Sequence, residues 1–296
     1  MDKLDAMQTF VRVAEAGSFI AVANQQQVAR SAVTRQVASL ETYLGTKLIT
    51  RSTRSLTLTA AGAAYLEKCR VILNMVDAAE SSLNEEKTVP RGRIRLGLPL
   101  SYGLYELIPM LLEFAKTQPF IELVMDLSDQ RSNLIEEGLD LSIRITGDLQ
   151  PGDIVRRLGE CRLLTLASPA YLREHGEPRH PNDLRHHECL IYASDSTTNT
   201  WPYRESKKPL QVAVRGRIVA NNGIALAEAA ARGMGIARQP DFIAAPYLER
   251  KKVRSILENF ESEPLGIYAV LPSNRYVPHR VRVLIDYLVE RLTATP

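Results

Sequence analysis

The apolar positions of the first 45 residues fall into three short helical patterns. In the first pattern they recur at intervals of three and four residues, at Leu4, Met7, Val11 and Ala14, as on one face of a helix. Gly17 ends that helix, and Ser18 is a suitable cap for a second helix over residues 19–26. A third helix, from about residue 31 to 44, ends at Gly45 and turns these residues inward: Val33, Val37, Leu40 and Leu44.

A short basic hairpin follows the three helices. Two extended segments, 48–49 and 56–58, flank the polar residues 51–54. This order of elements predicts a winged helix-turn-helix over residues 1–59. The first 60 residues hold seven Lys and Arg against four Asp and Glu, whereas the rest of the chain is neutral. Such a local excess suits binding to a polyanion, although a solvated helix face would explain the charge equally well.

A longer helical pattern occupies the next segment. Thr59 is a suitable cap, and the helix is expected to reach about residue 86. Its apolar positions alternate between intervals of four and three residues: Tyr65, Cys69, Ile72, Val76, Ala79 and Leu83. A heptad seam of this kind predicts pairing with a second chain, and the alternative is a helix that lies on its own domain. Residues 60–90 are therefore assigned as a linker helix and hinge, and Pro90 and Gly92 mark its end.

Beyond residue 90 the pattern changes to alternating strands and helices. Strands are predicted at 94–98, 121–126, 139–145, 163–167 and 267–271. Helices are predicted at 102–117, 222–232 and 278–292. This alternation predicts parallel α/β sheets, which bind ligands at the carboxyl ends of their strands.

Length and composition limit the class of protein. The chain has 296 residues, of which 45% are hydrophobic and 24% charged, as in a globular protein of two or three domains. No uncharged signal core lies near the start, and no apolar run approaches the ~20 residues of a membrane span. Three widely spaced cysteines favour a reducing compartment. We expect a cytoplasmic protein without a membrane partner.

Sequence motifs for catalysis, cofactors or metals are missing. A dinucleotide loop at Gly233 and Gly235 is excluded because Arg238 stands where the third glycine is needed. The spacing of the His and Cys residues between 175 and 189 fits no four-ligand metal site. We therefore predict no enzymatic activity, no cofactor and no metal. Two alternative classes lack their signals: a solute-binding protein would need an export signal, and a hydrolase or other enzyme on an α/β scaffold would need a catalytic constellation.

Several segments together resemble one family. In the first 62 residues these are 10–19 (FVRVAEAGSF), 31–37 (SAVTRQV), 40–41 (LE), 44–45 (LG), Leu48, 51–54 (RSTR) and 58–62 (LTAAG). Later segments add 140–144 (DLSIR), 167–172 (ASPAYL) and 233–236 (GMGI). The chain resembles the LysR-type transcriptional regulators over essentially its whole length. It departs from the family's usual pattern at Gln26, where Leu is common, and at Ala29, where Ser or Thr usually caps the recognition helix.

The resemblance implies an α/β protein with an all-α N-terminal domain. The expected parts are a winged helix-turn-helix, a long dimerisation helix and an effector domain, residues 91–296, like the type 2 periplasmic solute-binding proteins. Its subdomain I would comprise 91–162 with 266–296, and its subdomain II 163–265. The implied partners are double-stranded promoter DNA, a small-molecule effector, and copies of the chain in a homodimer and homotetramer. The resemblance leaves open a contact with RNA polymerase.

The third helix and the hairpin carry the residues expected at DNA. Side chains near the start of a recognition helix reach base edges in the major groove, which selects Arg30, Ser31, Thr34 and Arg35. Hairpin residues are better placed for phosphate or a narrow minor groove, which selects Arg51, Thr53 and Arg54.

The effector is expected between the subdomains and is predicted to be anionic. A strand ends at Leu98 and Ser101 is expected to open a helix, so that free backbone N–H groups and a hydroxyl favour a carboxylate. A second helix start lies at residues 221–222. The full set of candidate residues is Leu100, Ser101, Tyr102, Ser128, Ser168, Asn221 and Asn222. The alternative is that Ser101 and Asn221 are helix caps without a ligand.

Overall fold

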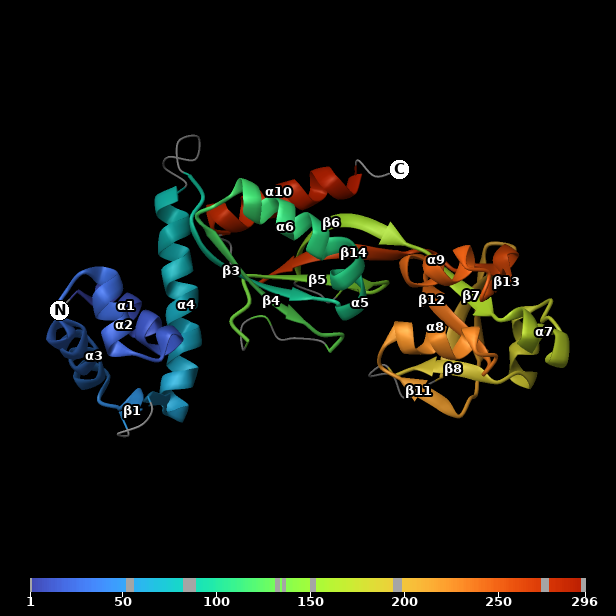
Figure 1. Ribbon diagram of the computed structural model, residues 1–296, viewed down its shortest axis with the longest axis horizontal. Helices are drawn as coiled ribbons and strands as arrows, with labels where there is room; N and C mark the ends of the chain where they lie inside the picture. Colours follow the sequence, from blue (N-terminus) through green and yellow to red (C-terminus); the bar gives the residue numbers. More distant parts are fainter. Residues whose placement is uncertain are drawn as a thin grey trace.

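In the computed structural model, the chain is described at residues 2–51, 56–81, 89–130, 134, 137–149, 153–193, 199–272 and 277–293. An N-terminal helical domain, a long helix and two α/β subdomains follow one another along the longest axis of the molecule (Figure 1). Within these ranges, no helix is both long enough and apolar enough to cross a membrane.

The N-terminal domain is the predicted winged helix-turn-helix. Its elements are α1 (Lys3–Ala16), α2 (Phe19–Gln26), α3 (Arg30–Leu44) and the antiparallel strands β1 (Ile49–Arg51) and β2 (Leu56–Leu58). The predicted helix ends are confirmed. Gly17 and Gly45 end α1 and α3 with φ of 61° and 67°, and Ser18 Oγ accepts a hydrogen bond from Ala21 N at 3.2 Å. Only glycine adopts such positive φ values without strain.

Helix α4 (Ala60–Ser81) begins at the predicted cap, where Thr59 Oγ1 accepts from Gly62 N at 2.9 Å. Cys69 is fully buried in the core of the N-terminal domain, and Tyr65 packs on Phe10 with ring centroids 5.9 Å apart. The prediction that Tyr65 and Cys69 face a second chain is therefore wrong. These side chains pack into the domain's own core. An apolar pattern with a period of 3.5 residues shifts gradually around a straight helix of 3.6 residues per turn, so the two halves of the pattern face different directions.

The second half of α4 turns apolar side chains outward. Ile72 and Met75 are each 38% exposed, Ala79 is exposed and Val76 is half-buried. Leu83, the last residue of the predicted seam, lies outside the described residues.

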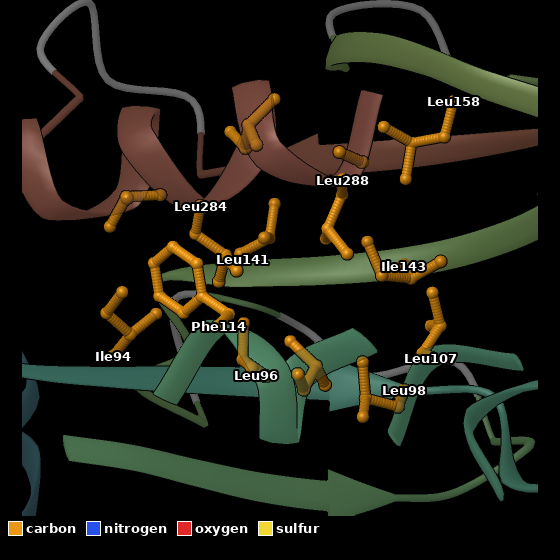
Figure 2. Packing of buried hydrophobic residues seen from close by; sticks show 14 of the residues in the cluster. Ile94, Leu96, Leu98, Leu107, Phe114, Leu141, Ile143, Leu158, Leu284 and Leu288 are labelled. Carbon is orange, nitrogen blue, oxygen red and sulfur yellow. The ribbon is translucent and has the colours of Figure 1, made fainter. Parts of the chain in front are cut away.

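Subdomain I is built on a five-stranded sheet in the order β4-β3-β5-β14-β6. The strands are β3 (Gly92–Leu98), β4 (Ile121–Leu127), β5 (Leu141–Thr146), β6 (Ile154–Cys161) and β14 (Leu265–Leu271). Its helical segments are α5 (Leu100–Tyr102), the π-helical η1 (Gly103–Leu107), α6 (Ile108–Thr117) and α10 (His279–Thr293). Phe114, Leu284 and Leu288 pack against buried strand residues, among them Ile94 and Leu141 (Figure 2).

Subdomain II has its own five-stranded sheet in the order β11-β8-β12-β7-β13. The strands are β7 (Leu163–Ala167), β8 (Cys189–Tyr192), β11 (Ile218–Ala220), β12 (Ile236–Pro240) and β13 (Arg254–Ile256). Around them lie α7 (Pro169–His175), η2 (Pro181–His186), the hairpin β9 (Thr200–Glu205) and β10 (Lys208–Ala213), α8 (Gly223–Ala231), α9 (Asp241–Glu249) and η3 (Glu258–Phe260). Leu226 and Ala230 of α8 pack on one face of the sheet, whereas Tyr203 and Val212 of the hairpin belong to the cluster on the other.

Both sheets are mixed, and the prediction of purely parallel sheets is wrong. In subdomain I, β3 pairs in parallel with β4 and β5, but β14 runs antiparallel to β5 and β6. The reason is the path between the subdomains. The chain leaves subdomain I through β6, crosses at Arg162 and returns through β14, so the outgoing and returning strands run in opposite directions.

Candidate DNA-binding and effector sites

The predicted major-groove residues lie together at the start of α3. Arg30, Ser31 and Arg35 are exposed and Thr34 is half-buried. The opposite side of the helix is fixed by Val33, Val37 and Leu40, which are at most 1% exposed. In Figure 1, α3 lies at the outer edge of the N-terminal domain, away from α4. The helix therefore presents this group of polar side chains to an approaching ligand.

The start of α3 lacks a capping side chain. Ala29 is the N-cap residue and no side chain accepts a hydrogen bond from the first turn, so Ser31 does not replace the missing cap. The first N–H groups of a helix have no partner within it. A phosphate of DNA can accept from such groups, and the helix dipole favours its negative charge.

Glu41 joins the other end of α3 to the hairpin. Its side chain is 8% exposed, with Oε1 accepting from Leu48 N at 3.0 Å and Ile49 N at 3.1 Å, while Oε2 accepts from Lys47 Nζ at 2.6 Å. Burial alone would raise the pKa of Glu41, but these partners outweigh it and hold the pKa below its ordinary value. Arg51 is the last residue of β1, and its side chain, Thr53 and Arg54 lie outside the described residues.

A cluster of arginines around Glu15 connects the N-terminal domain to the rest of the chain. Glu15 of α1 accepts from Arg70 of α4 at 3.0 Å and from two residues of β3, Arg93 at 2.7 Å and Arg95 at 2.9 Å. We call this group the Glu15 junction. The Glu15 side chain is 20% exposed. One carboxylate therefore ties together the DNA-binding domain, the linker helix and the effector domain.

Two predicted effector residues meet across the subdomains. Asn222 Nδ2 of subdomain II donates to Ser101 Oγ of subdomain I at 3.4 Å. Asn222 is also the cap of α8, because its Oδ1 accepts from Ile224 N at 3.0 Å and Ala225 N at 3.2 Å. Ser101 is 4% exposed and lies in the first turn of α5. The expectation that Ser101 opens that helix is wrong, because the cap position is Pro99.

Some of the other predicted effector residues lie near Ser101, and others do not. Leu100 and Tyr102 flank Ser101, and Ser128 follows β4 with its N–H donating to Leu98 O at 2.9 Å. Asn221 is exposed and does not cap α8. Ser168 does not belong to this group. Strands β7 and β12 are antiparallel with Leu163 opposite Pro240, so Ser168 lies at the far end of the sheet, where it caps α7 by accepting from Tyr171 N.

Two polar residues of this region were missed from the sequence. Asp129 Oδ1 accepts from Leu100 N at 2.9 Å, so a carboxylate of the chain already occupies the first turn of α5. Gln239 is 1% exposed, and its Nε2 has no hydrogen-bond partner among the described residues. A Cβ placed on Gly223 would lie 2.4 Å from Gln239 Oε1, so this amide lies beneath the first turn of α8. The available signal was a glutamine in a short segment, Ile236–Pro240, that begins with the apolar Ile236 and Ala237.

The histidines between residues 175 and 187 have structural contacts. The ring of His175 stacks on Tyr171 at 4.3 Å between centroids, and Tyr171 OH is 3.2 Å from His187 Nδ1. His180 Nε2 lies 3.1 Å from Glu205 Oε1. Burial and the neighbouring His175 lower the pKa of His187. In the described part of the chain, no three His, Cys, Asp or Glu side chains are arranged to hold a metal ion.

Comparison with known proteins decides the family. Residues 4–63 match the model of the bacterial regulatory helix-turn-helix proteins of the lysR family, and residues 87–293 match the LysR substrate binding domain. The chain belongs to the LysR family of transcriptional regulators. It is 35% identical to an HTH-type transcriptional regulator of Xanthomonas campestris over 96% of this chain and 83% of that protein.

Solved structures of LysR-type regulators show the same arrangement. CrgA of Neisseria meningitidis is 32% identical, with a TM-score of 0.61 over 97% of this chain and 98% of that one. The Vibrio cholerae virulence activator AphB is 27% identical, with a TM-score of 0.58 over 97% and 99%. LysR-type regulators are DNA-binding proteins without enzymatic activity; they bind promoter DNA and small-molecule effectors and form oligomers. This LysR-type regulator therefore combines a DNA-binding domain with an effector-binding domain.

Proposed function

We propose that this LysR-type regulator reads promoter DNA with the exposed start of α3. Arg30, Ser31, Thr34 and Arg35 would enter the major groove. The uncapped N–H groups behind Ala29 would hold a phosphate. Arg51, Thr53 and Arg54 of the wing would contact the DNA backbone or minor groove. The exposure of this polar group on a rigidly packed helix supports the assignment.

In the proposed assembly, a homodimer forms through the exposed face of α4 that contains Ile72, Met75 and Ala79. The effector domains would join two dimers into a homotetramer, placing pairs of α3 helices on successive turns of DNA. The regulator would act in the cytoplasm, where promoter DNA and RNA polymerase are accessible.

The proposed effector is a small anion bound beside the first turn of α8. The observation that carries this proposal is the buried Gln239 Nε2 beneath that turn, which lacks a hydrogen-bond partner in the described part of the chain. An unpaired buried donor is costly, and an acceptor oxygen of a ligand would satisfy it. The helix dipole adds to the preference for negative charge. Asp129 already occupies the first N–H of α5, so the anion belongs on the α8 side, within reach of Ser101.

Calorimetry with a panel of small carboxylates tests the effector site. Gln239→Leu removes the donor, Ser101→Ala removes the hydroxyl, and Asn221→Ala is the matched control because Asn221 is exposed and does not cap α8. A carboxylate that binds the parent should bind the first two variants roughly tenfold more weakly, with affinity for the control unchanged. Equal affinity for all four proteins would move the effector elsewhere.

A further inference from the structure

A recess lies between the two subdomains, beside the crossing of the chain at Arg162. Its volume is about 360 Å³, and it is widely open to solvent. Subdomain I contributes Tyr102, Glu106, Glu160 and Cys161, and subdomain II contributes Asp241 and Phe242. We call this recess the acidic crevice. It is separate in chemistry from the Ser101 and Asn222 pair, whose side chains are neutral.

The charges of the acidic crevice are all negative. Three carboxylates line it, and none of its described lining residues is Lys, Arg or His. Glu160 is paired with Arg157 at 2.5 Å, and Asp241 Oδ2 accepts from Arg162 N at 3.0 Å. For the Glu106 side chain, no hydrogen bond or ion pair is found within the part of the chain that the structure describes. Glu106 and Asp241 thus line the crevice from different subdomains. Neither forms a salt bridge within the described residues, although the charge of Arg162 lies near Asp241.

Tyr102 supplies a separate observation that points to a ligand. It is 5% exposed, yet its hydroxyl, at the crevice wall, makes no hydrogen bond to any described residue. The hydroxyl oxygen itself is not enclosed by the protein, so a ligand in the crevice can reach it and donate a hydrogen bond to it. Burial, followed by the charge of Glu106, raises the pKa of Tyr102, which keeps the phenol protonated. Its ring packs edge-on against Phe242 at 5.0 Å between centroids.

We propose that the acidic crevice binds a small organic cation, a primary ammonium on a short apolar body. The ammonium would lie between Glu106 and Asp241 and donate to the Tyr102 hydroxyl. The apolar body would lie against the Phe242 ring, where a cation close by is further favoured. Because the two carboxylates belong to different subdomains, the bound cation stabilises their present relative position. This site goes beyond the proposed anionic effector and is distinct from it.

Titration calorimetry on the full chain, with benzylamine as the probe, tests the site. Benzyl alcohol and benzoate have nearly the same shape with neutral and negative charge. Benzylamine should bind saturably, at least about tenfold more tightly than either analogue. Glu106→Gln should weaken benzylamine binding on the order of tenfold. Glu249→Gln, an exposed carboxylate of α9 outside the crevice, should leave it unchanged.

Tyr102→Phe keeps the ring and removes only the unpaired hydroxyl, so it serves as a second test should Glu106→Gln fail to fold. It should weaken benzylamine binding several-fold, about the worth of one hydrogen bond. Benzylamine that binds no better than benzyl alcohol would overturn the proposal. So would equal affinities of Glu106→Gln and Glu249→Gln for the amine.

Discussion

At the scale of single residues, the two ends of α3 are held in different ways. Glu41 fixes the carboxyl end, since its carboxylate accepts from two backbone N–H groups of the wing and from Lys47. Ala29 leaves the amino end without a side-chain cap. A missing cap costs a helix about 0.5 to 2 kcal/mol. Helix α3 is thus stabilised at its carboxyl end and uncapped at the end proposed to meet DNA, so a phosphate bound there would also stabilise the helix.

Replacement of Arg35 by alanine separates base recognition from general affinity for DNA. Arg35 is exposed on α3 and can donate two hydrogen bonds to a guanine, so its loss should cost about 1 to 3 kcal/mol and relax the preference at one base pair. Arg54→Ala in the wing should instead weaken binding to all sequences alike and reduce the salt dependence. Fluorescence anisotropy on operator variants at several salt concentrations distinguishes the two results. Unchanged preference and salt slope in both variants would contradict the groove assignment.

Residues that act locally could be predicted from the sequence, whereas those that act at a distance could not. Gly17, Ser18 and Gly45 end or cap helices within a few residues of themselves, so their spacing was sufficient. Gln239 and Asp129 become site residues only because separate strands end side by side. Ser168 was misplaced for the same reason, since its strand runs opposite to β12. Strand direction is a property of the whole sheet and is absent from local patterns.

At the scale of elements, the apolar seam of α4 is buried within the chain in its first half and exposed in its second half. Its sequence repeats every three to four residues without interruption, yet Cys69 is fully buried within the chain while Ile72, one turn later, is 38% exposed. A heptad pattern predicts that an apolar stripe of the helix will be buried, but it does not identify the partner that buries it. The packing of α4 against α1 determines which residues of the seam are buried within the chain. This packing depends on the folded domain and cannot be predicted from the local pattern.

Charged substitutions on the exposed half of α4 should separate the subunits. Ile72→Asp and Met75→Asp would each place a charge in an apolar contact, which is costly without a partner. We expect each variant to sediment as a smaller species than the parent at the same protein concentration. Val219→Asp, at an equally apolar position that is 57% exposed on β11, is the control and should leave the assembly intact. Parent-like sedimentation of both α4 variants would place the dimer contact on another surface.

At the scale of the whole molecule, the outward and return crossings between the subdomains explain several features together. Strands β6 and β14 run side by side in opposite directions, so the sheets are mixed and the subdomains share a short hinge. Ser101 with Asn222, and Glu106 with Asp241, come from opposite sides of this division. A ligand at either position contacts both subdomains. It can therefore change their relative position only by binding one arrangement more tightly than another.

The Glu15 junction should make the DNA-binding domain unfold together with the rest of the chain. Glu15→Gln leaves three guanidinium groups, those of Arg70, Arg93 and Arg95, without their shared carboxylate. Hydrogen bonds to charged groups contribute about 1.5 to 3 kcal/mol each where they are shielded from water, and partial exposure reduces this. We expect the variant to lose roughly 1 to 3 kcal/mol and the DNA-binding domain to melt in a separate, earlier transition in calorimetry.

The matched control for the Glu15 junction is Glu113→Gln, which breaks one exposed pair with Arg291. An isolated surface pair contributes at most about 1 kcal/mol, so this variant should keep a single transition. High salt should reproduce part of the Glu15→Gln effect in the parent, since half-exposed ion pairs are screened. Hydrogen exchange then locates the change: faster exchange in α1 and β3 together is expected if the junction carries the contact between the domains. Parent-like exchange in both elements would show that apolar packing of α1 on α4 holds the domain without it.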